Sequence, residues 1–251
     1  MQHMQAILRR AADMRTRLAS GDSLTQQGVD ELEAAWEQYR THLRPGEKAE
    51  RLLLVGSGGE PTELVAPRWL ARLFGLRHKC AHVVLQWESP CFGRMFVLEV
   101  RSWNNGNRAG HLDVVGGHVA QGESRTSETT AYREMEEELG ILQGDLVGES
   151  LRPRGGYLTY EERGEDSFFN AEWCDVYLGQ LKSDSLGKIR FTDGEVVGIY
   201  LCPVHLARDL LSQRLIPIAS ALERSLPICI EESPAESRDA RRLGRVRVKP
   251  R

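Results

Sequence analysis

The 251-residue sequence lacks the usual features of secreted, membrane-spanning and general nucleic-acid-binding proteins. Its five cysteines are odd in number and never stand in a C-x-x-C pair, which argues against a disulfide framework or a zinc ribbon. No apolar run approaches the roughly 20 residues that span a bilayer, and the N-terminal segment has no uninterrupted apolar core typical of a signal peptide. The net charge of −3 lacks the basic excess of a general nucleic-acid binder. We therefore expect a soluble, cytoplasmic protein with no membrane partner and no specific nucleic-acid partner.

The first 49 residues favour a helical hairpin. Apolar residues recur at helical spacing over residues 7–18 and again over residues 29–43, and a Ser-Gly-Asp-Ser turn separates the two runs. Residues 1–49 are therefore predicted to form an N-terminal extension that buries its apolar stripe on the main domain or on a second subunit. The second arrangement would make the protein a homodimer.

From residue 50 onward, strand-like segments are followed by isolated helices. The expected strands are RLLLV, TELV, CAHVVLQW, RMFVLEVRSW, HLDVV, NAEWCDVYLGQL and EVVGIYLCP, and the expected helices are PRWLARLFGLR, SETTAYREMEEEL, HLARDLLSQ and IASALERSL. This order favours one α/β (α+β) domain over residues 50–230. Residues 231–251 have few apolar side chains and end strongly basic, so we expect a disordered tail.

The helix expected over residues 127–139 carries several carboxylates in its last turns. On a helical wheel Glu137 and Glu138 each fall within about 60° of Glu134, so the three share an edge about 100° wide, whereas Glu136 points the opposite way. Carboxylates are unfavourable near a helix C-terminus, and like charges three or four residues apart repel by about 0.2–0.5 kcal/mol per pair. Three hard oxygen ligands on one edge suit Mg²⁺ or Mn²⁺. A solvated acidic face is the alternative. The buried stripe of the helix is expected to hold Ala131, Met135 and Leu139.

The residues around this helix favour metal binding. Gly116 and Gly117 end a short strand, where the missing Cβ lets a ligand or a backbone carbonyl approach closely. Glu123 lies in the loop before the helix, and a bidentate pair with Arg133 would clamp that loop onto the helix. Gly140 supplies the cap that ends the helix.

The segment GGHVAQGESRTSETTAYREMEEELGI resembles the signature of the Nudix hydrolases, G-x5-E-x7-R-E-U-x-E-E-x-G-U, in which U is aliphatic. The matching positions are Gly117, Glu123, Arg133, Glu134, Met135, Glu137, Glu138, Gly140 and Ile141. Nine residues instead of seven separate Glu123 from Arg133. The two extra residues fall at Ser124-Arg125 in the loop, where an insertion leaves the helix register intact. A weaker resemblance extends over about residues 77–215.

The resemblance implies a Nudix-type α/β/α sandwich around a mixed β-sheet and a Mg²⁺- or Mn²⁺-dependent hydrolase. Its substrate would be a small molecule with a diphosphate linkage, usually a nucleoside diphosphate joined to another moiety. The resemblance also implies the metal ligands, which are Glu134, Glu137, Glu138 and the Gly116 carbonyl. Glu123 and Arg133 complete the implied catalytic set by orienting these ligands. The chemical reason is that a diphosphate repels a nucleophile unless divalent ions neutralise its oxygens and activate a water.

The general base has several candidates. One is a glutamate of the helix itself, and another is a carboxylate in YEERGEDSFFNAEW, because some family members carry the base on a loop after the signature. Glu165 and Glu162 are preferred there, since a turn at Gly164 would carry them over the site. Tyr160 in the same segment offers a ring to a flat substrate group. For each carboxylate in this segment, simple solvation is the alternative.

Histidines near a cysteine suggest a second kind of site. His78 and His82 flank Cys80 and would share one face of an extended segment, a pattern compatible with zinc. No second cluster in the sequence completes four ligands, so structural histidines are the favoured interpretation.

Two other functions remain as alternatives. HKCAHVVLQ and GHLDVVGGHVAQGE resemble the branch of the superfamily that includes isopentenyl-diphosphate isomerase, whose chemistry uses a cysteine before the signature. LDVVGGHV has no cysteine, which disfavours an isomerase. A nucleotide-sensing regulator would bind through the same fold without turnover. The signature retains every acidic position, which favours the hydrolase.

Overall fold

The computed structural model describes most of the chain between residues 24 and 230. The described ranges are 24–40, 50–104, 108–122, 126–163 and 168–230. The first predicted helix, Glu123, Glu165 and the predicted C-terminal tail lie outside these ranges. Within them, no helix combines the length and the apolar character that crossing a bilayer requires.

Strands and helices follow one another as the sequence indicates, with one addition. The strands are β1 (Arg51–Val55), β2 (Pro61–Pro67), β3 (His78–Ser89), β4 (Gly93–Arg101), β5 (Leu112–Asp113), β6 (Val115–His118), β7 (Arg152–Arg163), β8 (Phe168–Gln180) and β9 (Val196–Pro203). The helices are α2 (Gln26–Trp36), α4 (Arg68–Phe74), α5 (Glu128–Leu139), α6 (Ala207–Gln213) and α7 (Ser220–Ile230). Short 3-10 helices are η1 (Glu37–Tyr39), η2 (Gln143–Asp145), η3 (Val147–Glu149), η4 (Ser185–Lys188) and η5 (Val204–Leu206). The addition is β7.

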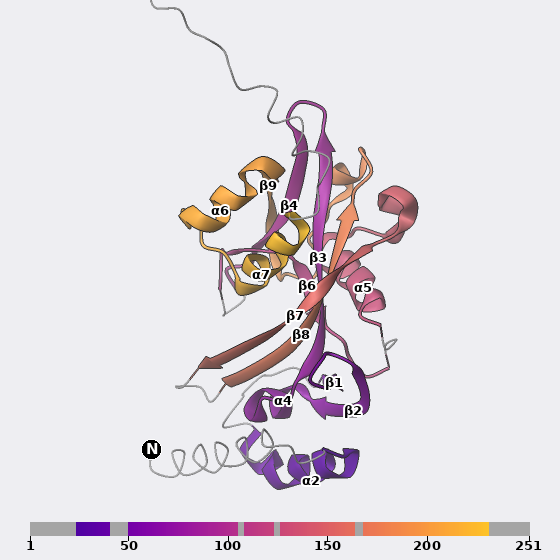
Figure 1. The fold of residues 1–251 in the computed structure, drawn as a ribbon, viewed down its shortest axis with the longest axis vertical. Coiled ribbons are helices and arrows are strands. Elements are labelled where there is room, and N and C mark those ends of the chain that lie inside the picture. Colours follow the sequence, from indigo (N-terminus) through magenta and orange to yellow (C-terminus); the bar gives the residue numbers. More distant parts are fainter. Residues whose placement is uncertain (1–23, 41–49, 105–107, 123–125, 164–167, 231–251) are drawn as a thin grey trace, which may run out of the picture.

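A mixed sheet organises the described part of the chain, and β3 is its central strand. β3 pairs antiparallel with β1, β4 and β6 and parallel with β8. β9 continues the sheet beside β4, and β7 lies on the outer side of β8. Figure 1 shows β3 running along the long axis of the molecule, with its far end forming the hairpin to β4. Because both faces of the sheet are covered, β3 is buried along almost its whole length, polar residues included.

Helices cover both faces of this sheet. Along β3, Ala81 and Val83 pack in a core with Met135 of α5. Val84 points the other way, into a core that contains Leu222 of α7. Figure 1 shows α5 on one side of the sheet and α6 and α7 on the other. The predicted α/β/α sandwich around a mixed sheet is therefore confirmed.

The N-terminal region adds a third core. α2 begins after Thr25, whose hydroxyl accepts a hydrogen bond from the Gly28 N–H at 3.1 Å, a standard N-cap. Its apolar residues Val29 and Trp36 are buried in a cluster built with β1, β2 and α4. The Trp36 ring meets the edge of Phe74 at a centroid distance of 5.1 Å. The second predicted N-terminal helix thus packs on its own chain, and homodimer formation stays a prediction.

Much of the segment after the signature, where a loop was expected, lies in the paired strands β7 and β8. β7 pairs with β8 from Arg152 to Arg163, so Tyr160 and Glu162 lie in a strand. The prediction of a loop there was wrong because Gly155 and Gly156 interrupt the apolar alternation of β7, and charged residues end it. Pairing with β8, which itself pairs with β3, fixes the strand through contacts far along the chain.

Candidate active site

The acidic helix α5 forms as its local sequence dictates. It ends at Leu139, and Gly140 adopts the left-handed conformation (φ 65°) that caps it. At the other end Ser127 is the N-cap residue, and its hydroxyl bonds outward to Asp175 and, at 2.9 Å, to the Tyr177 hydroxyl. The predicted stripe is fully buried, and it contains Ala131, Met135 and Leu139. Burial of this stripe fixes which edge of α5 faces the sheet.

Carboxylates from four parts of the chain gather at the C-terminal half of α5. We define the acidic site by Glu99 of β4, Asp113 of β5, Glu134, Glu137 and Glu138 of α5, and Asp193 and Glu195 before β9. Oxygen atoms of Glu138, Asp193 and Glu195 all lie within 4.8 Å of one another. Glu99 is opposite Asp113 in the β4–β5 pairing. The helix therefore contributes one side of a cluster that the sheet completes.

Glu138 is the most deeply placed carboxylate of the helix. Its side chain is buried, and Oε2 accepts a hydrogen bond from the Gly116 N–H at 3.1 Å. Burial raises the pKa of Glu138 well above its usual range, and the nearby Glu99 and Glu134 charges raise it further. A buried carboxylate in this environment is stable as an anion only next to a cation.

The pKa values of two carboxyl groups near Glu138 are also raised. Burial, then the Asp113 charge, raises the pKa of Glu99 to about 8. Burial also raises the pKa of Glu134 to about 7, although the adjacent Arg133 opposes that shift. In the described residues, Oε1 of Glu99 is buried without a hydrogen-bond partner. An orphaned carboxylate oxygen among raised carboxyl pKa values fits a divalent cation with oxygen ligands.

Arg133 contacts the helix carboxylates directly. Its guanidinium lies 2.9 Å from Glu134 Oε1 and 2.8 Å from Glu137 Oε2, and it donates to the His118 carbonyl at 3.2 Å. The predicted partner of Arg133, Glu123, is outside the described residues, and the contacts with Glu134 and Glu137 were not predicted. Arg133 thus fixes the orientation of Glu134 and Glu137 and ties α5 to β6.

Gly117 leaves room for the carboxylate of Glu134. A Cβ added at Gly117 would stand 1.8 Å from Glu134 Oε1. The predicted close approach at the end of this strand is therefore present, and the group that approaches is a proposed metal ligand. At Gly116 a Cβ would meet the Ala81 carbonyl oxygen at 2.7 Å, so backbone packing requires that glycine.

Replacing Gly117 by alanine should remove activity without unfolding the protein. The end of the Glu134 side chain is flexible and will move away from the new methyl group, which displaces a carboxylate of the acidic site. We expect kcat/KM to fall by about 100-fold, the scale of a misplaced catalytic group, with little change in melting temperature.

The matched control for this change is Gly144→Ala, because nothing lies within 4 Å of a Cβ at that position. Its activity should equal that of the wild type. Wild-type activity in Gly117→Ala would show that catalysis does not depend on where the Glu134 carboxylate lies.

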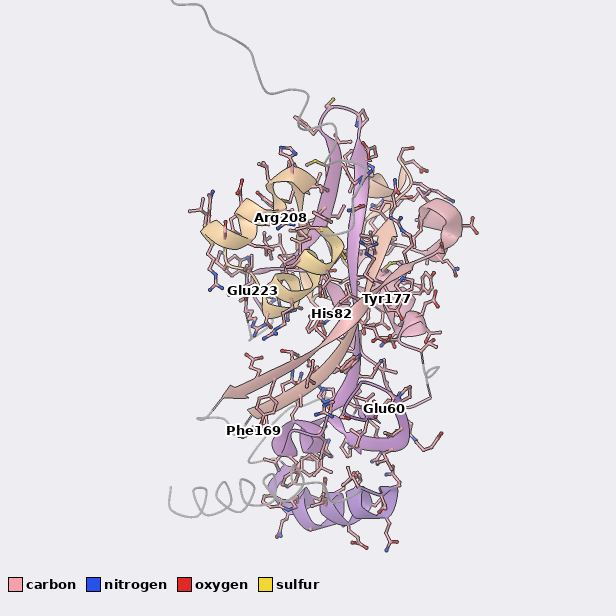
Figure 2. The ribbon with its side chains drawn as sticks, viewed as in Figure 1. Glu60, His82, Phe169, Tyr177, Arg208 and Glu223 are labelled. Atoms are coloured by element: carbon pink, nitrogen blue, oxygen red, sulfur yellow. The ribbon has the colours of Figure 1, made fainter. Side chains whose placement is uncertain are left out.

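Of the candidates for base and substrate contact, Tyr160 can be placed relative to the acidic site. Glu162 lies on β7, and its side chain is outside the description, as is the whole of Glu165. Tyr160 is 58% exposed and tilts against Phe169, with ring centroids 6.4 Å apart. Figure 2 labels Phe169 at the outer end of the β7–β8 hairpin, well separated from α5 as placed in Figure 1. Tyr160 therefore lies away from the carboxylates of α5.

The sequence analysis missed four members of the acidic site. They are Glu99, Asp113, Asp193 and Glu195. One signal was available, because Glu99 is a lone charge in the apolar strand RMFVLEV. A charge on a strand with both faces covered is unusual and requires a polar neighbour.

A groove opens near the N-terminus of α5. It has a volume of about 460 Å³ and is lined by the turn at Gly58–Glu60 together with Lys79, Trp173, Asp175 and Tyr177. Lys79 Nζ lies 2.8 Å from Asp175 Oδ2. Because Asp175 and Tyr177 both bond to Ser127, the groove adjoins the start of α5. Seven residues of helix, about 10 Å, separate Ser127 from Glu134.

The comparisons with known proteins agree with this arrangement. The model of the family described as NUDIX domain matches residues 77–222. The Deinococcus radiodurans protein DR0079 has a similar fold, with a TM-score of 0.51 and 20% identity over 72% of this chain and 99% of that chain. No curated protein matches the chain.

Two further solved structures are similar at a lower level. The NUDIX domain of Shewanella oneidensis NrtR, in complex with ADP ribose, has a TM-score of 0.44 and 14% identity over 60% of this chain and 84% of that chain. The C. elegans Ap4A hydrolase has a TM-score of 0.43 and 18% identity over 60% of this chain and 93% of that chain.

Proposed function

This chain belongs to the Nudix family of pyrophosphate-bond hydrolases, and on that premise we propose that it cleaves the diphosphate linkage of a nucleoside diphosphate joined to another moiety, with Mg²⁺ as the cofactor. The observation that carries the proposal is the acidic site. Glu138 and Glu99 are buried carboxylates with raised pKa values, and they face one another across the end of α5. Arg133 and Arg101 offset part of the charge of the cluster, and bound cations would offset the charges of Glu99 and Glu138.

The proposed metal ligands are the carboxylates of Glu134, Glu137 and Glu138 and the carbonyl oxygen of Gly116. When bound, divalent cations neutralise diphosphate oxygens and lower the pKa of a coordinated water. The Gly116 N–H holds the Glu138 carboxylate in place, and Arg133 holds the other two. These contacts orient the ligands before substrate binds.

We propose Glu195 as an additional general-base candidate beside the helix glutamates and the earlier candidates Glu162 and Glu165. A general base must lie within hydrogen-bond reach of the attacking water. Glu195 qualifies because its carboxylate lies close to that of Glu138, a proposed metal ligand. Glu123 keeps its proposed role of orienting the site. The groove beside Ser127 is the proposed place for the substrate group beyond the diphosphate, and Trp173 offers it an aromatic face.

A hydrolysis assay tests the proposal. The full chain is incubated with nucleotide sugars, dinucleotides, nucleoside triphosphates and coenzyme diphosphates, with Mg²⁺ or with chelator. We expect Mg²⁺-dependent cleavage of at least one compound, and activity lower by about 100-fold or more in Glu137→Gln because a metal ligand is removed. The fold should survive this change, because the Glu137 side chain is 51% exposed.

The matched control is Glu136→Gln, an exposed neighbour on the other side of α5. It should keep full activity. Tight binding of a nucleotide without turnover of any compound would contradict the hydrolase and favour a sensor, and movement of a double bond without phosphate release would favour an isomerase.

A further inference from the structure

A second group of metal-ligand side chains lies on the other side of the sheet from α5. We call it the histidine cluster, and its members are His78, Cys80, His118 and Glu172. Figure 2 labels His82 near the middle of β3. The histidine cluster lies further along that strand, toward the end where β1 pairs with His78.

Strand register brings these four side chains together. Cys80 of β3 is opposite His118 of β6, and His78 of β3 is beside Glu172 of β8. Because side chains alternate along a strand, His78 and Cys80 share one face of β3. The glycines before His118 show which face this is. A Cβ at Gly117 would touch Glu134 of α5, whereas a Cβ at Gly116 would touch His82, so His118 points away from the acidic site.

The spacing of the ligand atoms fits one metal ion. The nearest nitrogen, sulfur and oxygen atoms of the histidine cluster all lie within 4.8 Å of one another. Glu172 Oε1 lies 3.4 Å from His118 Nε2 and 3.8 Å from His78 Nε2. Tetrahedral zinc with bonds of about 2.0–2.3 Å places its ligand atoms about 3.3–3.8 Å apart. Small side-chain movements therefore convert the cluster into a tetrahedral site.

The hydrogen bonding of His78 makes its inward nitrogen an acceptor. Nδ1 lies 2.9 Å from the Leu76 carbonyl oxygen, which accepts only, so Nδ1 carries the proton. In the neutral ring Nε2 then carries an unprotonated lone pair, and this nitrogen faces the Glu172 carboxylate. A metal-binding histidine usually has this arrangement, with its other nitrogen donating to a backbone carbonyl.

In the described part of the chain, the inward nitrogens of His78 and His118 lie near the Glu172 carboxylate but make no hydrogen bond of good geometry. Nε2 of His78 and Nε2 of His118 are both buried without a hydrogen bond there, and the His78 residue is fully buried. Buried polar atoms are normally paired. A cation there would satisfy both lone pairs and would also neutralise the Glu172 carboxylate, whose Oε1 already accepts a hydrogen bond from Asn170 Nδ2.

We propose that the histidine cluster is a zinc site that ties β3, β6 and β8 together. Two imidazoles and a thiolate favour zinc, whereas the all-oxygen acidic site favours magnesium. Cys80 loses its proton on binding, and the thiolate and the carboxylate together balance the charge of Zn²⁺. The zinc is structural, because all four ligands come from the protein. It holds β6 where that strand delivers Gly116 and Gly117 to the acidic site.

His82, which the sequence placed beside Cys80, has a different environment. Its Nδ1 lies 2.9 Å from the Tyr157 hydroxyl and 3.2 Å from Ser225 Oγ. The interpretation of His78 as a purely structural histidine rested on the missing ligands, and strand pairing supplies these as His118 and Glu172.

Cobalt titration tests this proposal independently of the proposed function. The purified full chain is treated with chelator, and Co²⁺ is added while the absorption spectrum is recorded. We expect about one equivalent of Co²⁺ to produce tetrahedral ligand-field bands and a sulfur-to-cobalt charge-transfer band, which Zn²⁺ then displaces. The oxygen ligands of the acidic site cannot give the sulfur band, so Glu138→Gln should keep it.

Variants assign the band to Cys80. Cys80→Ser should abolish it, and Glu172→Gln should keep it but weaken Co²⁺ affinity by about 100-fold or more, above the usual effect of an outer-shell partner. Cys202→Ser, another buried cysteine, and Cys91→Ser, the exposed one, are controls that should leave it unchanged. If Cys80→Ser does not fold, the Glu172→Gln affinity decides the assignment. Absence of the sulfur band in folded wild-type protein, or its persistence in folded Cys80→Ser, would overturn the proposal and leave an imidazole–carboxylate pair.

Discussion

Replacing Glu138 by glutamine is expected to lower kcat/KM for diphosphate hydrolysis by about 1,000-fold or more. A metal ion contributes several kcal/mol to the stabilisation of transition-state charge, and each 1.36 kcal/mol corresponds to about tenfold in rate. Glu138 is buried at the centre of the acidic site and is held by the Gly116 N–H. Its amide replacement keeps the shape and the acceptor oxygen but removes the negative charge that a cation needs.

The same substitution should leave the fold intact. Burial and the neighbouring charges already disfavour the Glu138 anion in the absence of metal. Glutamine removes this cost, so the metal-free variant should be at least as stable as the metal-free wild type at pH 8. A substitution that lowers activity while it maintains or raises stability identifies a functional carboxylate, because loss of a carboxylate that supports the fold would lower stability.

Activity and thermal melting are measured on the same protein preparations. Glu136→Gln is the control, because Glu136 is exposed and lies outside the acidic site. A Glu138→Gln protein that melts at the wild-type temperature and hydrolyses substrate at the wild-type rate would remove Glu138 from the mechanism.

The second large effect is expected in the pH dependence of stability. The metal-free protein should lose stability as the pH rises from about 6.5 to about 8, and saturating Mg²⁺ should reverse most of this loss. Below pH 6.5, His82 and His118 oppose the change, because burial lowers their pKa values and only the unfolded chain takes up protons there. Burial and the neighbouring carboxylates raise the pKa of Glu99 from 4.5 to about 8 and that of Glu134 from 4.5 to about 7.

The sign follows from proton binding. Between pH 4.5 and the raised pKa values, the folded state keeps protons that the unfolded chain has released. The contribution of these two groups to stability is therefore fully present below pH 4.5 and is lost as the pH rises through about 7 and 8. Each such group changes stability by about 1.4 kcal/mol per pH unit in this window. Mg²⁺ binds the ionised form, and a concentration 100 times its dissociation constant adds about 2.7 kcal/mol.

Urea unfolding at a series of pH values, with chelator or with Mg²⁺, measures both parts. Glu99→Gln should flatten the metal-free profile, because one raised carboxyl group is gone. A metal-free stability that increases between pH 6.5 and pH 8 would contradict the raised pKa values of Glu99 and Glu134. An equal Mg²⁺ effect at both pH values would contradict binding to these carboxylates.

Local sequence was sufficient to predict the helix α5, which carries Glu134, Glu137 and Glu138 of the acidic site. The positions of Ala131, Met135 and Leu139 fix the buried face of α5, and helical geometry then places Glu134, Glu137 and Glu138 on a common edge. Gly140 ends the helix through its left-handed conformation, which any reader of the sequence can expect. Information within one helix sufficed because each of these contacts spans only a few residues.

The part of the acidic site that comes from the sheet depends on strand pairing and could not be predicted from local sequence. Glu99 meets Asp113 only because β4 pairs with β5 in one register, and a shift by one residue would point both side chains to the opposite face. The histidine cluster has the same origin, since β3, β6 and β8 supply its members. β7 was missed for a related reason, because its partner β8 fixes it more strongly than its own sequence does.

Titration of the protein with Mn²⁺, followed by electron paramagnetic resonance of the free ion, tests most directly whether the carboxylates of α5 hold the catalytic cations. The protein is first loaded with Zn²⁺ so that the histidine cluster does not contribute. The account predicts Mn²⁺ binding by the wild type at pH 8 and binding at least about 100-fold weaker in Glu138→Gln, with Glu136→Gln unchanged. Equal Mn²⁺ binding by wild type and Glu138→Gln, or no binding by either, would contradict it.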